Sequence, residues 1–547
     1  MAALWSSTSM SLEQARLERD AGSMNWDFPY ASRRMPLMAR NVVAASQPLA
    51  AQAGLQMLAN GGNAIDAALA AAISLTVVEP NMNGIGSDAF AILWDGEQLH
   101  GLNASGQSPQ AWSPQHFESY KQMPTRGWDA VTVPGCVSAW KALSERFGRL
   151  PFADLFAPAI RYARDGWLVP PVTAISWNMA SETYADMPDW HAAFTIDGRA
   201  PQAGERFRFP AQATTLERIA ATGGEAFYRG DLAEKIIAHA QNTGGLMTAE
   251  DLAAHESHWV EPLAIDYKGQ SLHEIPPSGQ GITALIALGI LRQFDLSSHP
   301  VDSADSLHLQ IEAMKLAFAD AKRYVSDPQT RDIDFEQLLD DAYLKRRAAD
   351  IDMAQARTPT FGAPGQGETV YLTAADQEGR MISFIQSNFS GFGSGIVVPD
   401  TGISLQNRGS GFVLDAGHPN QVDGGKRPYH TIIPAFVTRD QQPLISYGVM
   451  GGHMQPQGHA QVMVRLFDYE QNPQAALDAP RWRFDTGLDV GVESAVGATV
   501  LAELERRGHQ LREQGPAKFG GGQLIYRLED GYIAASEPRK DGQAVGY

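Results

Sequence analysis

Apolar stretches at helical spacing predict helices in the first two thirds of the chain. Ser46-Gln47-Pro48 supplies an N-cap and a first-turn proline before LAAQAGLQMLAN, and Gly61-Gly62 ends that helix. A second, more apolar helix is expected over 64–78. This stretch carries Asp66 and is shorter than the roughly 18 to 20 apolar residues that cross a bilayer, so it predicts a buried helix.

Further helices are expected to dominate from Gly135 to about Asp350. The most regular of them is SLHLQIEAMKLAFADAKRYVSDP, whose apolar positions form one face and which Asp327-Pro328 ends. The stretch between the early helices and Gly135 contains a glycine-rich corner followed by AFAILWDG and EQLHGLNA. Their alternation predicts a β-hairpin that turns at Asp95-Gly96.

The pattern changes to alternating strands from Thr369 onward. TVYLTAAD and RMISFIQSN flank a turn at Gln377-Glu378-Gly379, and TIIPAFV and LISYGVM follow later. No Ser-, Pro- or Gly-rich linker divides the chain, and no repeat is visible. The segment TPTFGAPGQGE, just before Thr369, has the small, polar composition of an accessible cleavage site.

Composition and charge exclude several classes of protein. The chain has 547 residues, 44% hydrophobic and 19% charged, as in a soluble globular protein. Its 43 Lys and Arg against 62 Asp and Glu give a net charge of −19, which disfavours nucleic acids and anionic membranes as partners. The first residues contain no Sec-type signal, so a cytoplasmic location is expected. The single cysteine, Cys136, excludes an internal disulfide or a multi-thiolate metal site, and we expect it to be a small buried residue.

Three short motifs resemble known sites but have the wrong context. Gly84-Ile85-Gly86 precedes a strand, whereas a dinucleotide loop precedes a helix. His255 and His258 are three residues apart instead of the four of a zincin motif, and Phe392 stands where a nucleophile elbow around Ser394 needs glycine. We therefore expect no metal and no organic cofactor.

Thr369 stands where a flexible glycine-rich segment meets a buried strand. If the peptide bond before it were cut, its hydroxyl would lie beside its own α-amine, whose unperturbed pKa of roughly 7.7 to 8.0 suits a general base at neutral pH. One residue would then supply both nucleophile and base. An ordinary strand residue is the alternative that this pattern alone leaves open.

Several longer segments resemble the γ-glutamyltransferase family of N-terminal-nucleophile (Ntn) hydrolases. The resemblance extends from Ala44 to Tyr547 and follows the family's order. The matching segments include SQPLAAQAGLQMLANGGNAIDAA, GIGSDAF, PGCVSAW, PPSGQG, EAMKLAFADAKRY, GFGSGIV, GKRPYHTIIP, MGGHMQPQGHAQ, DAPRW and PRKDGQAVGY. This resemblance implies an α+β fold of four layers, αββα. It also implies a precursor that cuts itself into a large subunit, 1–368, and a small subunit, 369–547, which stay together as one intertwined domain.

The resemblance assigns roles to matching residues. Thr369 becomes the nucleophile, and Glu368 supplies the carbonyl attacked during self-cleavage through an N-to-O acyl shift. Ser387 matches a second hydroxyl that hydrogen-bonds the threonine, and Gly451 and Gly452 match the pair whose N–H groups hold the oxyanion. A sheet hydroxyl and a plain turn are the respective alternatives.

The residues that grip a γ-glutamyl group in this family are largely replaced. Where the family has an arginine, an acidic residue, two serines and an asparagine, this chain has Ser105, Gly411, His430 with Thr431, and Phe389. A lost charge-assisted contact typically costs about 1.5 to 3 kcal/mol, so γ-glutamyl recognition is expected to be weak. A short lid segment between Phe412 and Lys426 favours hydrolysis over transfer.

These departures resemble the subgroup that contains YwrD-like proteins and oxamate amidohydrolase. Such an enzyme hydrolyses a small amide and needs a cation for its carboxylate. Arg408 and His430 are the candidates, with Thr431 and Ser105 as further substrate-binding positions. A solvated surface charge is the alternative for Arg408, and a strand cap is the alternative for His430.

Other functions stay open at this stage. A γ-glutamyltransferase or glutathione hydrolase, a cephalosporin-acylase-like enzyme and an unprocessed binding protein without activity all fit the family fold. The acidic surface is compatible with a monomer or a homodimer.

Overall fold

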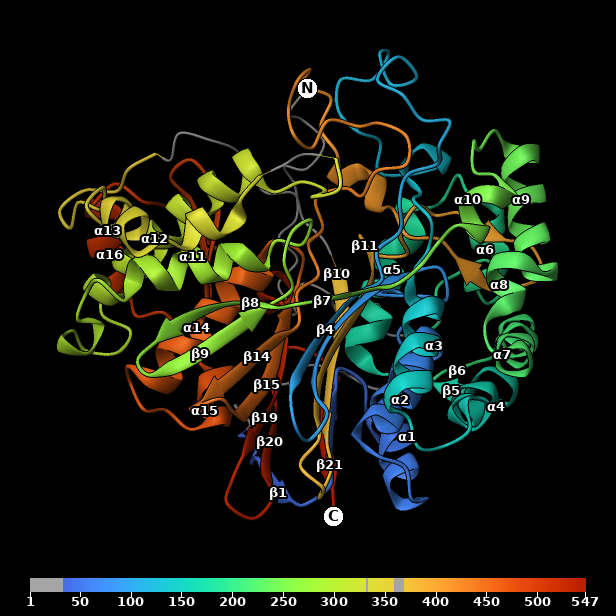
Figure 1. Ribbon diagram of the computed structural model, residues 1–547, viewed down its shortest axis with the longest axis horizontal. Helices are drawn as coiled ribbons and strands as arrows, with labels where there is room; N and C mark the ends of the chain where they lie inside the picture. The colour runs from blue at the N-terminus through green and yellow to red at the C-terminus, as the bar shows by residue number, and fades with distance from the viewer. Residues whose placement is uncertain (1–32, 331–332, 359–367) are drawn as a thin grey trace, which may run out of the picture.

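The structure, a computed structural model, describes residues 33–330, 333–358 and 368–547. Two seven-stranded sheets pack face to face, and helices cover the outer face of each (Figure 1). This arrangement confirms the predicted four-layer αββα fold. An apolar cluster that includes Phe90, Tyr371, Ile385 and Phe436 fills the space between the sheets.

Both sheets are antiparallel throughout. The first has the order β1 (Leu37–Ala39), β20 (Tyr532–Ser536), β19 (Gly521–Arg527), β15 (Gln442–Met450), β14 (Ala435–Arg439), β9 (Gln270–Glu274) and β8 (Leu263–Tyr267). The second has the order β21 (Gln543–Gly546), β2 (Val42–Ala45), β10 (Glu368–Ala375), β11 (Met381–Phe389), β3 (Asp88–Trp94), β4 (Leu99–Asn103) and β7 (His258–Val260).

The smaller sheets lie outside these two layers. They comprise β5 (Trp167–Leu168) with β6 (Arg206–Phe207), β12 (Val397–Val398) with β13 (Ile403–Ser404), and β16 (Trp482–Thr486), β17 (Asp489–Val492) and β18 (Gln510–Glu513).

The two helical layers come from different parts of the chain (Figure 1). The layer beside the second sheet contains α1 (Pro48–Ala59), α2 (Ala64–Val78), α3 (Cys136–Phe147), α4 (Ala157–Asp165), α5 (Pro171–Thr183), α6 (Pro188–Phe194), α7 (Pro210–Thr222), α8 (Glu225–Arg229), α9 (Asp231–Thr243) and α10 (Ala249–Ala253). The layer beside the first sheet contains α11 (Gly281–Leu291), α12 (Ala304–Tyr324), α13 (Asp341–Ala348), α14 (Met454–Phe467), α15 (Pro473–Asp478) and α16 (Ala498–Arg506).

The early helices form where the pattern predicts them. Every residue of α2 is buried, as its all-round apolar composition requires, and Asn63 and Asp66 form a reciprocal capping box at its start. Gln47, rather than Ser46, caps α1, because its side-chain oxygen accepts from Leu49 N at 2.6 Å, while the Ser46 hydroxyl bonds to the Glu79 carboxylate. The β3–β4 hairpin at Asp95-Gly96 is also confirmed.

The stretch expected to be mainly helical also contains strands. LAIDYKGQSLHE forms the β8–β9 hairpin, in which side chains alternate between the two faces of the sheet and Lys268 at the turn has φ of +53°. TIIPAFV forms a strand only from Ala435, since the residues before it belong to the loop that contains His430 and Thr431.

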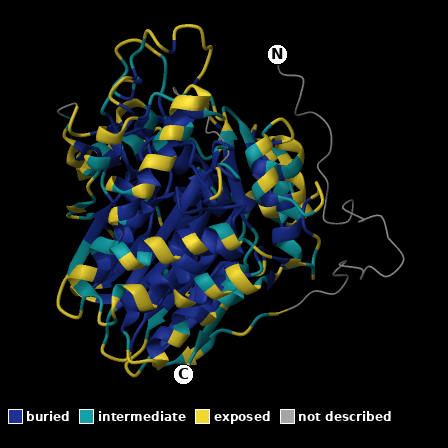
Figure 2. Cartoon of the chain, turned by 90° about the vertical axis from the view of Figure 1, so that its right-hand side faces the viewer, coloured by how far each residue is buried: buried dark blue, intermediate teal, exposed yellow. Residues whose placement is uncertain are grey.

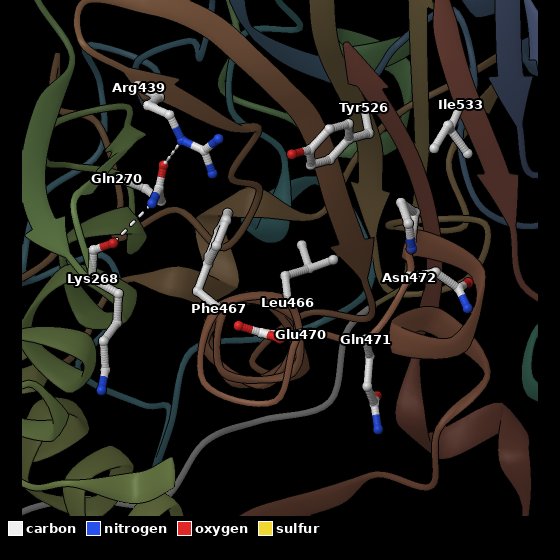
Figure 3. Close-up of a pocket in the computed structure, with 11 residues that line it drawn as sticks. Lys268, Gln270, Arg439, Leu466, Phe467, Glu470, Gln471, Asn472, Tyr526 and Ile533 are labelled. Carbon is white, nitrogen blue, oxygen red and sulfur yellow. Dashed lines mark hydrogen bonds between the residues drawn. The ribbon is translucent and has the colours of Figure 1, made fainter. Parts of the chain in front are cut away.

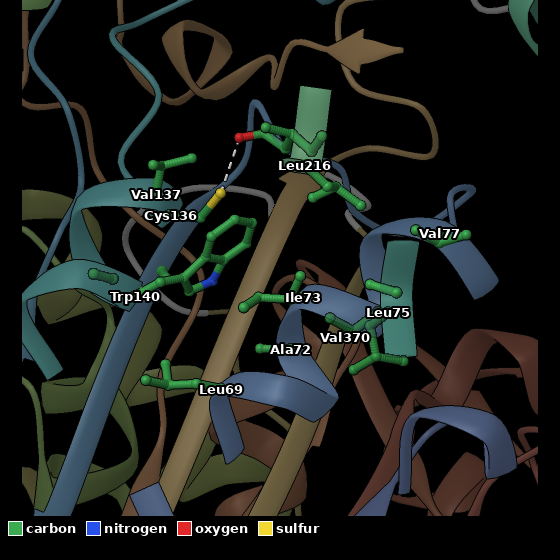
Figure 4. Packing of buried hydrophobic residues seen from close by; sticks show 14 of the residues in the cluster. Leu69, Ala72, Ile73, Leu75, Val77, Cys136, Val137, Trp140, Leu216 and Val370 are labelled. Carbon is green, nitrogen blue, oxygen red and sulfur yellow. Dashed lines mark hydrogen bonds between the residues drawn. The ribbon is translucent and has the colours of Figure 1, made fainter. Parts of the chain in front are cut away.

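Burial follows the layers. In Figure 2 the sheets and the inner faces of the helices are buried, whereas the outer helix faces are exposed. Figure 4 shows Cys136 beside Trp140, and its thiol donates to the Ile85 carbonyl at 3.0 Å. The side chain is fully buried, and burial raises the pKa of its thiol well above the usual value. The prediction of a small buried cysteine is confirmed.

Across the described ranges, every helix is too short or too polar to cross a bilayer.

A pair of buried histidines joins α12 to the segment before β18. His308 Nδ1 lies 2.8 Å from His509 Nε2, and His308 Nε2 lies 2.9 Å from the Asp352 carbonyl. Because a carbonyl only accepts, His308 donates from Nε2 and accepts from His509 at Nδ1. Burial lowers the pKa of both rings, that of His509 to about 3, so both are neutral at pH 7.

This pair predicts a loss of stability in acid. The folded pKa of His509, about 3, lies below the ordinary 6.5, so the unfolded chain binds more protons between these values. The contribution of the neutral His509 to the free energy of unfolding is therefore complete above pH 6.5 and is lost as the pH falls toward 3. Between pH 7 and pH 5 the unsubstituted protein should lose about 2 kcal/mol more of its free energy of unfolding than His509→Gln does. The difference in this free energy between the two proteins should therefore shrink by the same amount. Urea unfolding at both pH values measures this gap, and an unchanged gap would contradict the assignment.

Candidate active site

Thr369 lies at the start of β10, buried in the second sheet with 1% of its surface exposed. Its hydroxyl donates to Ser387 Oγ on β11 at 3.1 Å, and the Ser387 oxygen also accepts from Phe389 N at 2.8 Å. The pairing of β10 with β11 shifts register between Glu368 and Val370. Such a bulge turns a side chain away from the regular pleat. The structure thus brings together the two hydroxyls predicted from the sequence.

A glutamine that the sequence reasoning did not single out holds the same hydroxyl. Gln455 Nε2, in the first turn of α14, donates to Thr369 Oγ1 at 3.3 Å. The Gln455 carbonyl oxygen accepts from Ile433 N at 2.9 Å, so the orientation of the amide is defined. The segment MGGHMQPQGHAQ contained the only signal for this residue.

Gly451 and Gly452 form the turn between β15 and α14. Their φ angles are +117° and +59°, a region that favours glycine. The Gly451 carbonyl accepts from Met454 N, at the start of α14. Since N–H and C=O of one trans peptide point in opposite directions, the N–H of Gly452 is directed away from the helix. This orientation leaves it available to a ligand.

Gln280, in the PPSGQG segment, connects this turn to the neighbouring loop. Its Nε2 donates to the carbonyls of Gly452 at 2.9 Å and Thr431 at 2.7 Å. Its Oε1 accepts from Tyr429 OH at 3.1 Å. Gln280 is fully buried and fixes the positions of both segments relative to each other.

His430 forms a buried pair with Asp88. Its Nε2 lies 3.0 Å from Asp88 Oδ2, while its Nδ1 accepts from Ile432 N at 3.3 Å, so the proton is on Nε2. Burial and the nearby Arg408 cation lower the pKa of His430 well below its ordinary value. Burial raises the pKa of Asp88 to about 7, against the opposing effect of Arg408. Asp88 also lies directly opposite Ser387 in the pairing of β3 with β11, so this acid is part of the site although no role was predicted for it.

Arg408 is buried, with 1% of its surface exposed, at the start of a short 3₁₀ helix over Arg408–Gly411. The alternative of a solvated surface charge is therefore wrong. Its Nη1 donates to Thr431 Oγ1 at 2.6 Å, and its guanidinium carbon lies 4.9 Å from the centre of the Phe389 ring. Nε and Nη2 have no hydrogen-bond partner within the described ranges. Burial lowers the pKa of Arg408 to about 9, a shift that Asp88 partly offsets.

Ser105 is buried, but its hydroxyl is already used. It donates to Asn103 Oδ1 at 2.7 Å, and the Ser105 carbonyl accepts from Arg427 Nε at 3.1 Å. Arg427, in the KRP segment, is a second buried arginine for which the sequence predicted no role. Burial lowers the pKa of Arg427, and the Asp327 and Asp88 charges only partly offset this effect. Ser105 therefore contacts the site through Arg427 rather than through its own hydroxyl.

The predicted cleavage point is only partly described. Glu368 is the first residue of β10 and pairs with Phe389, whereas most of TPTFGAPGQGE, residues 359–367, lies outside the described residues. In the segment after Phe412, Lys426 Nζ donates to the carbonyls of Pro419 at 2.6 Å and Gln421 at 2.9 Å.

A surface pocket of about 410 Å³ lies at a distance from these residues in the fold, where the β8–β9 and β14–β15 turns meet the end of α14. Figure 3 shows Gln270 between Arg439, which donates to it at 2.6 Å, and the Lys268 carbonyl, to which it donates at 2.8 Å. None of the site residues predicted from the sequence lines this pocket.

Comparison with known proteins assigns the chain to a family. The family profile described as Gamma-glutamyltranspeptidase matches residues 50–547. The chain belongs to this family.

Its relatives within the γ-glutamyltranspeptidase family include proenzymes. The chain is 37% identical to the glutathione hydrolase-like YwrD proenzyme of Bacillus subtilis, over 93% of this chain and 98% of the relative. It is 35% identical to the oxamate amidohydrolase proenzyme of Klebsiella pneumoniae, over 91% and 97%. The solved cephalosporin acylase from Bacillus halodurans superposes with a TM-score of 0.92 at 48% identity, covering 96% and 99% of the two chains. The chain is therefore an Ntn hydrolase of the YwrD and oxamate amidohydrolase subgroup, in a family whose precursors are processed into two chains.

Removal of the Ser387 hydroxyl is expected to slow both self-processing and turnover. Ser387→Ala removes the acceptor for Thr369 Oγ1, so the nucleophile keeps its hydrogen bond from Gln455 but loses the one to Ser387. A lost buried hydrogen bond costs about 1 to 3 kcal/mol, so we expect processing and turnover to slow by about tenfold to a hundredfold. Densitometry of denaturing gels and kcat measure the two effects.

The matched control is Ser383→Ala on the same strand, whose hydroxyl contacts Tyr371 instead of Thr369. Equal losses in both variants would show that Ser387 acts only through stability.

Proposed function

We propose that this chain is a self-processing amidohydrolase that hydrolyses a small amide with a carboxylate on its acyl part, such as oxamate. The observation that carries this proposal is the buried Arg408, whose Nε and Nη2 lack acceptors within the described part of the chain. A buried guanidinium with two nitrogens free to donate matches the two oxygens of a carboxylate. Arg408 contacts Phe389, which pairs with Glu368, the acyl donor of self-cleavage.

Self-cleavage forms the nucleophile. Thr369 Oγ1 attacks the Glu368 carbonyl, the C–N bond breaks, and the Glu368 acyl group moves to the oxygen as an ester. This shift frees the α-amine of Thr369, and water then hydrolyses the ester to the Glu368 carboxylate and the Thr369 hydroxyl. Ser387 and Gln455 hold the threonine oxygen during both steps.

The amide substrate then follows the same path. The free α-amine accepts the proton from Oγ1 as the oxygen attacks the amide carbonyl, and the N–H groups of Gly451 and Gly452 bind the oxyanion. The amine leaves with a proton, and water hydrolyses the acyl-enzyme. Arg408 binds the carboxylate of the acyl part throughout, and the neutral His430 lies beside it.

The two products of cleavage, 1–368 and 369–547, are proposed to stay associated. In the second sheet, β10 pairs with β2 from the large subunit, and β11 pairs with β3, also from the large subunit. In the first sheet, β14 pairs with β9. Neither piece therefore has a complete sheet of its own, and separation would expose several strand edges.

A γ-glutamyl substrate fits this site less well. Its α-ammonium needs an acceptor, and Asp88 is already bound to His430 and to Gly135 N at 3.0 Å. Gly411 offers no carboxylate where the family has an acidic residue.

Parallel assays test the proposal. Ammonia release from oxamate is compared with nitroaniline release from γ-glutamyl and glutaryl nitroanilides, using the purified chain. We expect turnover of amides whose acyl part carries a carboxylate without an α-ammonium. Turnover of the γ-glutamyl anilide alone would overturn the substrate assignment, and a single stable band of full length on a denaturing gel would instead favour a binding protein.

A further inference from the structure

Lys322 lies in the last turn of α12, on the side of the helix that faces the candidate active site. One turn earlier, Phe318 packs against His453, with ring centroids 6.0 Å apart, and His453 directly follows Gly451 and Gly452. Residues four apart share one face of a helix, and helical side chains lean toward the N-terminus. The Lys322 side chain therefore extends toward Phe318 and His453.

Two cations act on the same imidazole. His453 is fully buried, and burial together with the positive charges of Lys322 and Arg408 lowers the pKa of His453 to about 3. The two cations come from different elements. Arg408 is bound to Thr431 in the loop before β14, whereas Lys322 belongs to α12.

Lys322 differs from the other buried lysines nearby. Lys315 Nζ pairs with Glu312 at 2.7 Å, and Lys426 Nζ donates to two carbonyls. Lys322 is half-buried, yet its amine has no ion pair or hydrogen bond to any residue in the described ranges. Burial lowers the pKa of Lys322 to about 7 with no acidic group acting against it. A half-buried ammonium without an anion loses part of its hydration without compensation, and a bound carboxylate would supply that compensation.

We infer that Lys322 binds a second carboxylate of the substrate, so that the preferred substrate is an amide carrying one carboxylate on its acyl part and another on its amine part. The inference rests on the proposed function. Arg408 lies on the acyl side because it contacts Phe389, the partner of Glu368 across the sheet. Lys322 approaches from α12, past His453, and is assigned to the amine that leaves.

Three amides with one acyl group test this assignment. Oxamate has no substituent on nitrogen, N-ethyloxamate has an uncharged one, and N-oxalylglycine has a carboxymethyl group of similar size. We expect the processed enzyme to prefer N-oxalylglycine over N-ethyloxamate by at least tenfold in kcat/KM. Lys322→Met should remove this preference and change kcat/KM for oxamate and N-ethyloxamate by less than threefold.

Two further variants serve as controls. Lys322→Arg keeps the charge and should keep the preference, and Arg323→Met removes an exposed cation at the next position of α12 without changing it. An unchanged preference in Lys322→Met, or an equal fall for all three amides, would overturn the inference.

A labelling experiment separates this inference from the proposed function. Trinitrobenzenesulfonate modifies unprotonated lysine, and peptide mass spectrometry follows Lys322. We expect succinate, but not propionate, to slow this labelling at least tenfold. Protection without any amide turnover would mean that the proposed reaction fails while the anion site stands. Equal labelling with and without succinate would overturn the anion site even if oxamate is hydrolysed.

Discussion

Replacing Thr369 with alanine is expected to leave the chain as a single piece of 547 residues and to abolish its amidase activity. The alanine has no oxygen to attack the Glu368 carbonyl, so neither the ester nor the free α-amine forms. Loss of a catalytic nucleophile typically lowers kcat on the order of 10⁵- to 10⁶-fold. Intact mass and denaturing gels report cleavage, and ammonia release reports activity.

Thr369→Ser is the matched control for this experiment, because it keeps the hydroxyl between Ser387 and Gln455. We expect it to process and to retain measurable turnover. If the alanine variant still separated into two fragments, or if unsubstituted protein remained active with residue 369 joined to residue 368, the N-terminal nucleophile would be the wrong assignment.

Replacing Arg408 with methionine is expected to lower kcat/KM for oxamate by about a hundredfold or more. Two charge-assisted hydrogen bonds of about 1.5 kcal/mol each account for about 3 kcal/mol, and each 1.4 kcal/mol is a factor of ten. The methionine keeps an apolar side chain against Phe389, so the loss reports the guanidinium rather than the packing.

Steady-state kinetics with oxamate and with an uncharged anilide measure this effect. In Arg408→Met, kcat/KM for the uncharged anilide should change by less than threefold, and self-cleavage should be complete. Arg439→Met, in the remote surface pocket, removes a cation of the same kind and should have no effect on either substrate. Equal losses on both substrates in Arg408→Met would assign Arg408 a purely structural role.

The elements that the sequence predicted are those whose signals are local. The α2 helix begins and ends within 64–78 as expected, because its capping box and its continuous apolar run lie within the same segment. The β3–β4 hairpin was found for the same reason, since its turn residues lie between its strands. The β8–β9 hairpin was missed, because it is a short piece of the first sheet inserted between long helices.

The candidate site was only partly predictable. Thr369 and Ser387 were found because the resemblance assigned them roles and both lie on segments that the sequence predicts as strands. Gln455 and Gln280 lie in segments that match the family, but no role was assigned to either residue, because each acts through a single amide group that reaches across the fold. Asp88 was assigned to the glycine-rich corner before the strand, and only the sheet register places it opposite Ser387.

The sequence by itself determined the helices and strands of the early region, the family and the threonine that would follow a cut, since these depend on neighbouring residues and on ordered segments. Only the tertiary structure decided that Asp88 holds His430 and that Arg408 is buried with donors that have no acceptor among the described residues. It also decided that Lys322 lies near His453, with no partner for its amine in the same part of the chain. The physical reason is that burial and electrostatic environment are set by elements distant in the chain. A side chain's charge can be read from the sequence, but the groups that surround and desolvate it cannot.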